Sequence, residues 1–285
     1  MGDYTIFHHI PWGGAYAIYF FTIGISAALF FFSALSCFRE EFKPLRLKAE
    51  VASFVLLLVS GGLLVGDLSQ PLRFLYAINP LYLNFASPLA WGALNLASFG
   101  IVSVLYMVMI KKGNEALAKQ LGVIGSLLAL GLPIYTGFDL TVHQNRPVWN
   151  TPLMPVLFVA LSLVSGAAVA TFLAAGEQRL LGVLRQIMLW SVGGVAVMLV
   201  SLMGTTWYGG IGQELTFMAL TSGSLSMSFL WLGVILGTAV PIALLLAPFG
   251  RQPSGVMLSA ALILVGGMAL RYSILVGGQI VQTYF

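Results

Sequence analysis

The stretch VASFVLLLVSGGLLV, residues 51–65, decides the fold class. Whole windows of it are apolar, whereas the strands of a membrane β-barrel alternate apolar and polar residues with a period of two. Apolar runs of about 20 residues are typical of membrane-spanning helices, because 20 residues at a rise of about 1.5 Å cross the hydrocarbon core. The stretch therefore predicts a transmembrane helix and excludes a β-barrel.

The rest of the chain repeats this pattern. It is 59% hydrophobic and 8% charged, with a mean hydropathy of +0.97, and charge this sparse would leave a water-soluble domain insoluble. We expect a single polytopic, all-α integral membrane domain over residues 1–285. Its eight helices are predicted at about 14–37, 50–68, 88–110, 121–140, 153–175, 187–206, 223–247 and 255–280.

The Lys and Arg residues predict the orientation of these helices. Ten of the thirteen fall in the short loops at 39–49, 111–120, 176–186 and 248–254. Such an excess marks loops that face the cytoplasm, so both termini and the loops at 69–87, 141–152 and 207–222 are expected outside. The pI near 9.3 then reflects contact with anionic headgroups and gives no reason to expect nucleic acid.

Tryptophans and glycines carry further expectations. Trp12, Trp91, Trp149 and Trp207 all fall near the outer boundary, which suits an aromatic belt. Two small-residue spacings, Gly62–Gly66 and Gly233–Gly237, indicate places where helices pack closely.

Ionisable residues in or beside a span are candidates for function, because an unpaired charge in the bilayer costs several kcal/mol. Most of those present gather near the outer surface. They are His8 and His9 before the first span, Asp67 at the end of the second, Tyr135 and Asp139 near the end of the fourth, and His143 just after it.

For two of the candidates, the sequence also predicts a position within the helix. Tyr135, Asp139 and His143 are spaced i, i+4, i+8, so a helix would carry all three on one face, although Pro147 favours a helix end before His143. Arg271 lies about ten residues from the outer end of the last span, about 15 Å deep by helix rise. This depth predicts a buried ion pair with Asp67 or Asp139, or a solvated cavity.

The residue inventory limits the chemistry. The three histidines all lie outside the hydrocarbon core, which argues against a haem held between two histidines inside the bundle. Cys37 is the single cysteine, too few for an iron–sulfur cluster or a zinc site, and no metal site is expected. A quinone fits what remains, since its carbonyl oxygens need donors such as His and Tyr and its redox reaction moves two protons.

Several strings resemble the NrfD-type family, the membrane-anchor subunits of polysulfide reductase and related respiratory molybdenum enzymes. They are HHIPWGGAYAIYFFTIGISAA (8–28), GDLSQPLRF (66–74), SPLAWGALN (87–95), PIYTGFDL (133–140) and WNTPLMPVLFVALSLVSGAA (149–168). The resemblance covers the first five helices and is weak over the last three.

This resemblance implies a haem-free subunit of eight helices in two four-helix bundles, in a bacterial or archaeal cytoplasmic membrane. It implies a quinone, menaquinone or ubiquinone, near the outer face, bound by His8 or His9 and Tyr135, with Asp67 in proton transfer. It also implies partners: an iron–sulfur subunit docked on the outer face and a catalytic subunit with a molybdenum bis-pterin cofactor.

We therefore expect the quinone-reactive membrane subunit of a multi-subunit oxidoreductase, inactive without its partners. Asp139 and Arg271 are expected to join Asp67 in proton transfer, and His143 is a further candidate for the site. Two alternatives remain at this point. A proton-coupled transporter would place its substrate site near the midplane, and a pure anchor would hold a redox partner without binding quinone.

Overall fold

The computed structural model describes residues 12–66, 75–76, 79, 81, 83 and 85–280, and all regular elements within them are helical. In chain order they are α1 (Gly14–Leu35), the 3-10 helix η2 (Glu40–Leu45), α2 (Arg46–Gly66), α3 (Pro88–Lys111), α4 (Glu115–Thr141), α5 (Leu153–Leu173), α6 (Gln178–Trp207), α7 (Ile211–Thr221), the π-helix η4 (Met227–Ala239), α8 (Val240–Leu246), the 3-10 helix η5 (Pro248–Arg251) and α9 (Pro253–Ile280).

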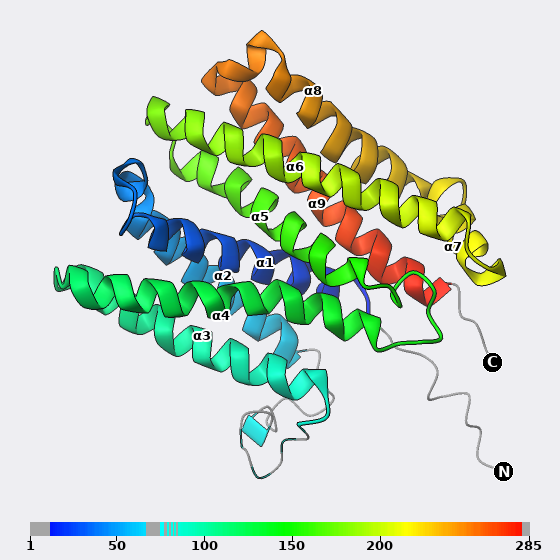
Figure 1. Cartoon of the computed structure of the whole chain (residues 1–285), viewed down its shortest axis with the longest axis horizontal. Helices are drawn as coiled ribbons and strands as arrows, with labels where there is room; N and C mark the ends of the chain where they lie inside the picture. The colour runs from blue at the N-terminus through cyan, green and yellow to red at the C-terminus, as the bar shows by residue number, and fades with distance from the viewer. Residues whose placement is uncertain are drawn as a thin grey trace.

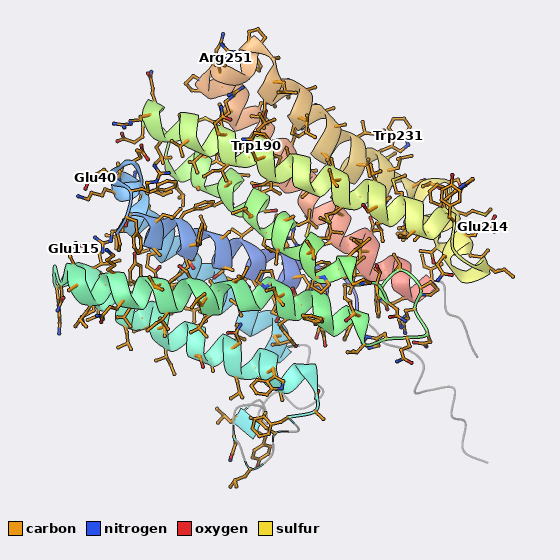
Figure 2. All side chains as sticks on the ribbon, viewed as in Figure 1. Glu40, Glu115, Trp190, Glu214, Trp231 and Arg251 are labelled. Carbon is orange, nitrogen blue, oxygen red and sulfur yellow. The ribbon has the colours of Figure 1, made fainter. Side chains whose placement is uncertain are left out.

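Eight segments of the described residues are long and apolar enough to cross a bilayer, with η4 and α8 together making one of them. Each corresponds to one predicted span, so the all-α fold of a multi-pass membrane protein is confirmed. Exposed tryptophans on the sides of the helices, such as Trp190 and Trp231, fit a surface that faces lipid (Figure 2).

Besides the fourth span, which begins at Glu115, six residues before the predicted start at 121, two boundary predictions were wrong. The sixth span begins at Gln178, nine residues before the predicted start at 187, because Arg185 turns inward and its guanidinium donates to the Leu245 carbonyl. The predicted loop at 207–222 contains the helix α7, which packs against α6 and α9. At both places, charged residues made a helical segment resemble a loop in the sequence.

Helix α1 lies at the centre of the bundle (Figure 1). It packs against α2, α4, α5 and α9, and it is the most buried of the spans. Most side chains of α1 therefore meet another helix, whereas Ile18 and Phe31 remain exposed.

The bundle has two chemically different ends. The basic end consists of the turns that follow α1, α3, α5 and α8, and it carries Glu40 and Glu115, whereas Glu214 lies at the opposite end (Figure 2). Two of the basic-end turns contain glycines in the left-handed region, Gly113 at φ 70° and Gly176 at φ 99°, a conformation that glycine adopts without strain.

The opposite end, called here the aromatic end, contains Trp12, Tyr16, His143 and Trp149. There the beginning of α1 lies beside the end of α9, and the Gln279 side-chain amide donates to the Trp12 carbonyl at 2.6 Å.

The two glycine spacings have different outcomes. Gly233 and Gly237 do pack closely, since a Cβ on Gly237 would overlap the backbone of Gly266 on α9. The prediction for Gly62 and Gly66 was wrong, because a Cβ on either would meet open space. These two glycines leave a groove where helix packing was expected.

Candidate functional site

Tyr135 and Asp139 lie one turn apart on α4, in the half of the bundle nearer the aromatic end. The Tyr135 ring fills the space left by Gly92 of α3, where a Cβ would overlap it. Asp139 is 9% exposed. A glycine on the facing helix therefore creates the position that the tyrosine ring occupies.

Helix α1 supplies two more phenols to the same region. Tyr16 and Tyr19 are both buried, and their hydroxyls lie within electrostatic range of the Tyr135 hydroxyl, as does the Asp139 carboxyl. Tyr19 also lies within electrostatic range of Asp139. Three phenols and a carboxyl from two facing helices thus converge at one depth.

Most of these polar groups have no hydrogen-bond partner in the part of the chain that the structure describes. The Tyr19 and Tyr135 hydroxyls and the Asp139 carboxyl form no hydrogen bond with any residue that the structure describes. Buried polar groups are normally hydrogen-bonded, and those that are not call for an explanation such as a ligand or water. The cluster can therefore offer two donors and a proton-exchanging carboxyl to a bound molecule.

A groove lies beside the same turns of α1. It is lined by Ala15 of α1 and by Val59, Gly62, Leu63 and Gly66 of α2, and its volume is about 380 Å³. Ala15 and Tyr19 are four residues apart and share a face of the helix. The groove is nearly all apolar and Val59 is 46% exposed, so a lipid-soluble molecule can reach it from the side.

His143 lies just after α4, which ends at Thr141. Its ring packs edge-on against Trp12 and Trp149, with centres 5.4 and 5.3 Å apart. Burial lowers the pKa of His143 below its ordinary value, so the ring favours the neutral form. The predicted helix end before His143 is confirmed, and the histidine belongs to the aromatic end cluster.

The loop that follows His143 is fixed to α9. The Arg146 guanidinium donates to the Gly278 carbonyl at 2.7 Å, and the Trp149 ring nitrogen donates to the Ile274 carbonyl at 2.8 Å. Trp149 is fully buried, so the prediction that it joins an interfacial belt was wrong. Its indole fills the space left by Gly278 and acts as an internal anchor.

Arg271 is fully buried on α9, as its predicted depth required. Its guanidinium donates to the Gly267 carbonyl at 3.2 Å and to the Ser162 hydroxyl at 3.3 Å, and lies 5.4 Å from the centre of the Phe21 ring. The predicted ion pair with Asp139 is not formed among the described residues, because Arg271 turns toward α1 and α5. A role for Arg271 in proton transfer stays a prediction.

The remaining predicted site residues, His8, His9 and Asp67, lie outside the described residues. Asp67 directly follows Gly66, which lines the groove. Within the described ranges no group of His, Cys, Asp and Glu side chains is arranged to hold a metal ion.

Sequence reasoning missed the contribution of α1. Trp12, Tyr16 and Tyr19 are spaced i, i+4, i+7, which places them on one face of a helix. That spacing, read together with the depth of Tyr135, could have predicted that the phenols of α1 and α4 converge.

The sequence matches a known protein family over nearly its whole length. A family model described as "Polysulphide reductase, NrfD" matches residues 5–282. The sequence is 30% identical to the C chain of polysulfide reductase from Wolinella succinogenes over 314 aligned residues, which cover 98% of this protein and 97% of that one.

Two further relatives have related names. Protein NrfD of Escherichia coli K12 is 29% identical, with 96% of each protein covered. A protein of Halobacterium salinarum, named as a putative dimethyl sulfoxide reductase membrane subunit, is 24% identical, covering 90% of this sequence and 66% of that relative.

Proposed function

This chain belongs to the NrfD family of membrane subunits of respiratory oxidoreductases, and we propose that it binds quinone and passes electrons to or from a partner. The bound quinone would exchange two electrons with the iron–sulfur clusters of a subunit docked at the aromatic end, which in turn serves a molybdenum catalytic subunit. The observation that carries this proposal is the set of polar groups at Tyr19, Tyr135 and Asp139, which have no hydrogen-bond partner among the described residues.

The phenols are suited to hold a quinone ring. Tyr19 and Tyr135 project from facing helices, and each hydroxyl is a donor that a carbonyl oxygen can accept. His8 or His9 is the further donor that we propose from the N-terminal segment. Donors fixed by packing would orient the ring without the cost of ordering them upon binding.

Asp139 is suited to handle protons. Its carboxyl is buried, lies one helical turn from Tyr135 and forms no ion pair with a described residue. A carboxyl in such surroundings can take or release a proton as the charge on a neighbouring group changes. Asp67, which follows the groove in the sequence, is the proposed group for exchange with the aqueous phase beyond the aromatic end.

The groove is suited to admit the ligand. A quinone arrives from the bilayer with a long apolar tail, and the groove between α1 and α2 is apolar and reached from the side. We place the protein in the cytoplasmic membrane of a bacterium or archaeon, with the aromatic end outside, as the distribution of Lys and Arg indicates.

The test is a comparison of two tyrosine variants in the whole complex. Tyr135→Phe should lower quinol-linked turnover at least tenfold, or about 1.4 kcal/mol, while the activity of the soluble subunits with an artificial dye stays unchanged. Tyr208→Phe is the matched control, because Tyr208 is 87% exposed and outside the cluster. Organic extraction of the purified complex should yield bound quinone.

Other outcomes would favour other functions. Equal quinol activity in both variants would remove Tyr135 from the mechanism. A complex without extractable quinone, in which site variants behave as wild type, would indicate a pure anchor. Solute uptake by vesicles that contain this protein alone would indicate a transporter.

A further inference from the structure

A second buried carboxyl lies far from the aromatic end. Glu50 is on α2, four residues after its first residue Arg46, and is completely buried. The Ser103 hydroxyl of α3 donates to Oε1 of Glu50 at 2.6 Å, and Oε2 of Glu50 has no hydrogen-bond partner among the described residues. The proposed site does not use this carboxyl.

No ion pair joins Glu50 to a cation that the structure describes. Arg46, one turn before Glu50 on α2, forms its ion pair with Glu115 of α4 at 2.8 Å, and Lys48, two residues before Glu50, donates to the Leu173 carbonyl at 3.4 Å. An isolated ionised carboxylate in an apolar interior costs many kcal/mol and instead takes up a proton. Glu50 is therefore a neutral acid whose Oε2 has no competing partner.

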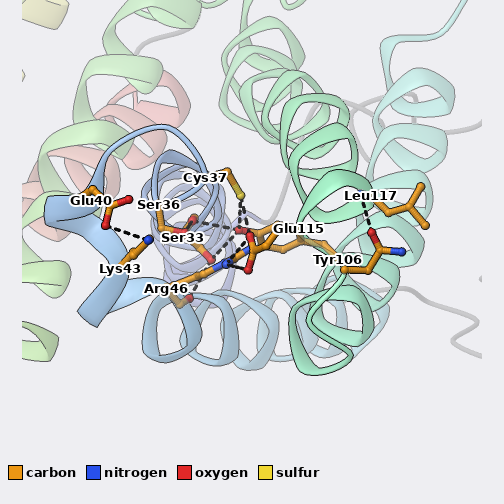
Figure 3. Close-up of polar contacts among 10 residues, drawn as sticks. Ser33, Ser36, Cys37, Glu40, Lys43, Arg46, Tyr106, Glu115 and Leu117 are labelled. Atoms are coloured by element: carbon orange, nitrogen blue, oxygen red, sulfur yellow. Dashed lines mark hydrogen bonds and ion pairs between the residues drawn. The ribbon is translucent and has the colours of Figure 1, made fainter.

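Beyond Ser103, polar groups continue toward the basic end, where Figure 3 shows those from Tyr106 to Glu115. Tyr106 lies one turn along α3 from Ser103, and its hydroxyl donates to the Ser33 carbonyl at 3.0 Å. Its oxygen lies 3.9 Å from the Cys37 sulfur, which accepts from Arg46 at 3.4 Å. These polar groups of α1, the turn after it, α2 and α3 end at Glu115 of α4, which is exposed to solvent.

Hydroxyl groups lead from Glu50 in the other direction. Glu50, Ser53 and Ser60 belong to the buried face of α2 and span about 15 Å of helix. Across the interface, the Ser26 and Ser53 hydroxyls lie 3.3 Å apart while each donates to the other's backbone carbonyl, and Thr22 pairs with Ser60 at 2.7 Å. A hydroxyl both donates and accepts and can rotate, so each pair can pass a proton onward once its hydrogen turns away from the backbone.

We propose that Glu50 is a proton-carrying carboxyl on a route through the interface of α1, α2 and α3. A proton from water at the basic end binds to a carboxylate oxygen of Glu50. It then leaves toward the Ser26–Ser53 and Thr22–Ser60 pairs, and the carboxylate is reprotonated from the basic end. The route points toward the turns that hold Tyr19, and it gives the protein a proton entrance separate from Asp67 and Asp139.

The first test uses infrared spectroscopy on the purified full-length protein. The protonated Glu50 should give a carbonyl stretching band that shifts in D₂O, moves in Glu50→Asp and disappears in Glu50→Gln. This measurement needs neither quinone nor partner subunits, so it stands even if the proposed function fails. A wild-type protein without such a band, or a band unchanged in both variants, would overturn the proposal.

The second test measures proton movement by the whole complex in vesicles. Glu50→Gln keeps an oxygen that accepts from Ser103, so a purely structural glutamate predicts normal behaviour of this variant. Our proposal predicts that proton uptake from the basic-end side falls at least tenfold, while dye activity and quinone content stay at wild-type values. Wild-type uptake in Glu50→Gln would refute it.

Two variants complete the second test. Ser103→Ala removes the hydrogen bond but keeps the carboxyl, so it should retain most of the uptake. Glu50→Asp should restore part of it. If Glu50→Gln does not assemble, the other two variants decide. A proton uptake that falls in both Glu50→Asp and Ser103→Ala, in proportion to their loss of stability, would count against the proposal.

Discussion

Two helix interfaces in this molecule are held together in opposite ways. Along the α1–α2 interface, hydroxyls pair: Ser26 and Ser53 each donate to the other's backbone carbonyl, at 2.8 and 2.7 Å. Along the η4–α9 interface, glycines meet: Gly237 and Gly266 touch so closely that neither has room for a Cβ. One interface uses polar contacts and the other close backbone approach.

The difference shows where chemistry can reside. Lipid offers helices little hydrophobic reason to associate, so both small residues and hydrogen bonds are used to join them. The glycine interface leaves almost no groups that could bind a ligand or a proton. The hydroxyl interface lies between the phenol of Tyr19, which has no hydrogen-bond partner among the described residues, and the buried acid Glu50, so the proposed reactions belong to this side.

The largest effect is expected from breaking the glycine interface. Gly266→Leu would push a side chain into the backbone of Gly237, which cannot yield, and should destabilise the protein by about 3 kcal/mol. Unfolding in mixed micelles measures this. Gly182→Leu, on the exposed face of α6 with no atom near its Cβ, should stay within about 0.5 kcal/mol of wild type. Equal stability of the two variants would contradict close packing.

Gly62, in the groove between α1 and α2, should tolerate a larger side chain that Gly266 does not. A Cβ on Gly62 would have no described atom within 4 Å, so Gly62→Leu should project into the groove and leave stability near that of wild type. Its side chain would compete with the quinone, and the apparent affinity for quinol should fall about tenfold, or about 1.4 kcal/mol. Steady-state kinetics of the complex measures this, and wild-type affinity in Gly62→Leu would show that the groove is not the entrance.

The paired hydroxyls of the α1–α2 interface should contribute a smaller free energy. A double-mutant cycle of Ser26→Ala and Ser53→Ala should give a coupling of about 0.6 kcal/mol, the average for hydrogen bonds between membrane helices. Micelle unfolding of the two single variants and the double variant measures it. Strictly additive effects would show that these serines do not hold the helices together.

The smallest effect concerns His143. Burial lowers its pKa below the ordinary 6.5, so below that pH the unfolded protein binds more protons than the folded one. The free energy of unfolding therefore does not depend on His143 above about pH 6.5, and it decreases as the pH falls below that value. Melting temperatures of wild type and His143→Gln, which cannot titrate, should diverge in that window, and parallel curves would exclude His143 as the cause.

The apolar pattern of the sequence was enough to predict the eight spans, and the spacing of Tyr135 and Asp139 predicted their common face. The missing parts depended on tertiary contacts. Arg185 lies within α6 because a carbonyl of another helix accepts its hydrogen bond, and Trp149 is buried because Gly278 leaves room for it. The partners of Arg271 could not be predicted, since a serine and a backbone carbonyl replace the expected carboxylate.

A photoreactive quinone tests the central claim most directly. After illumination of the native complex, the label should be found by mass spectrometry on peptides that contain Tyr19, Gly62 or Tyr135. Excess natural quinone should prevent the labelling. Label confined to α6, α7 or α9, or labelling that natural quinone does not suppress, would contradict a quinone site between α1, α2 and α4.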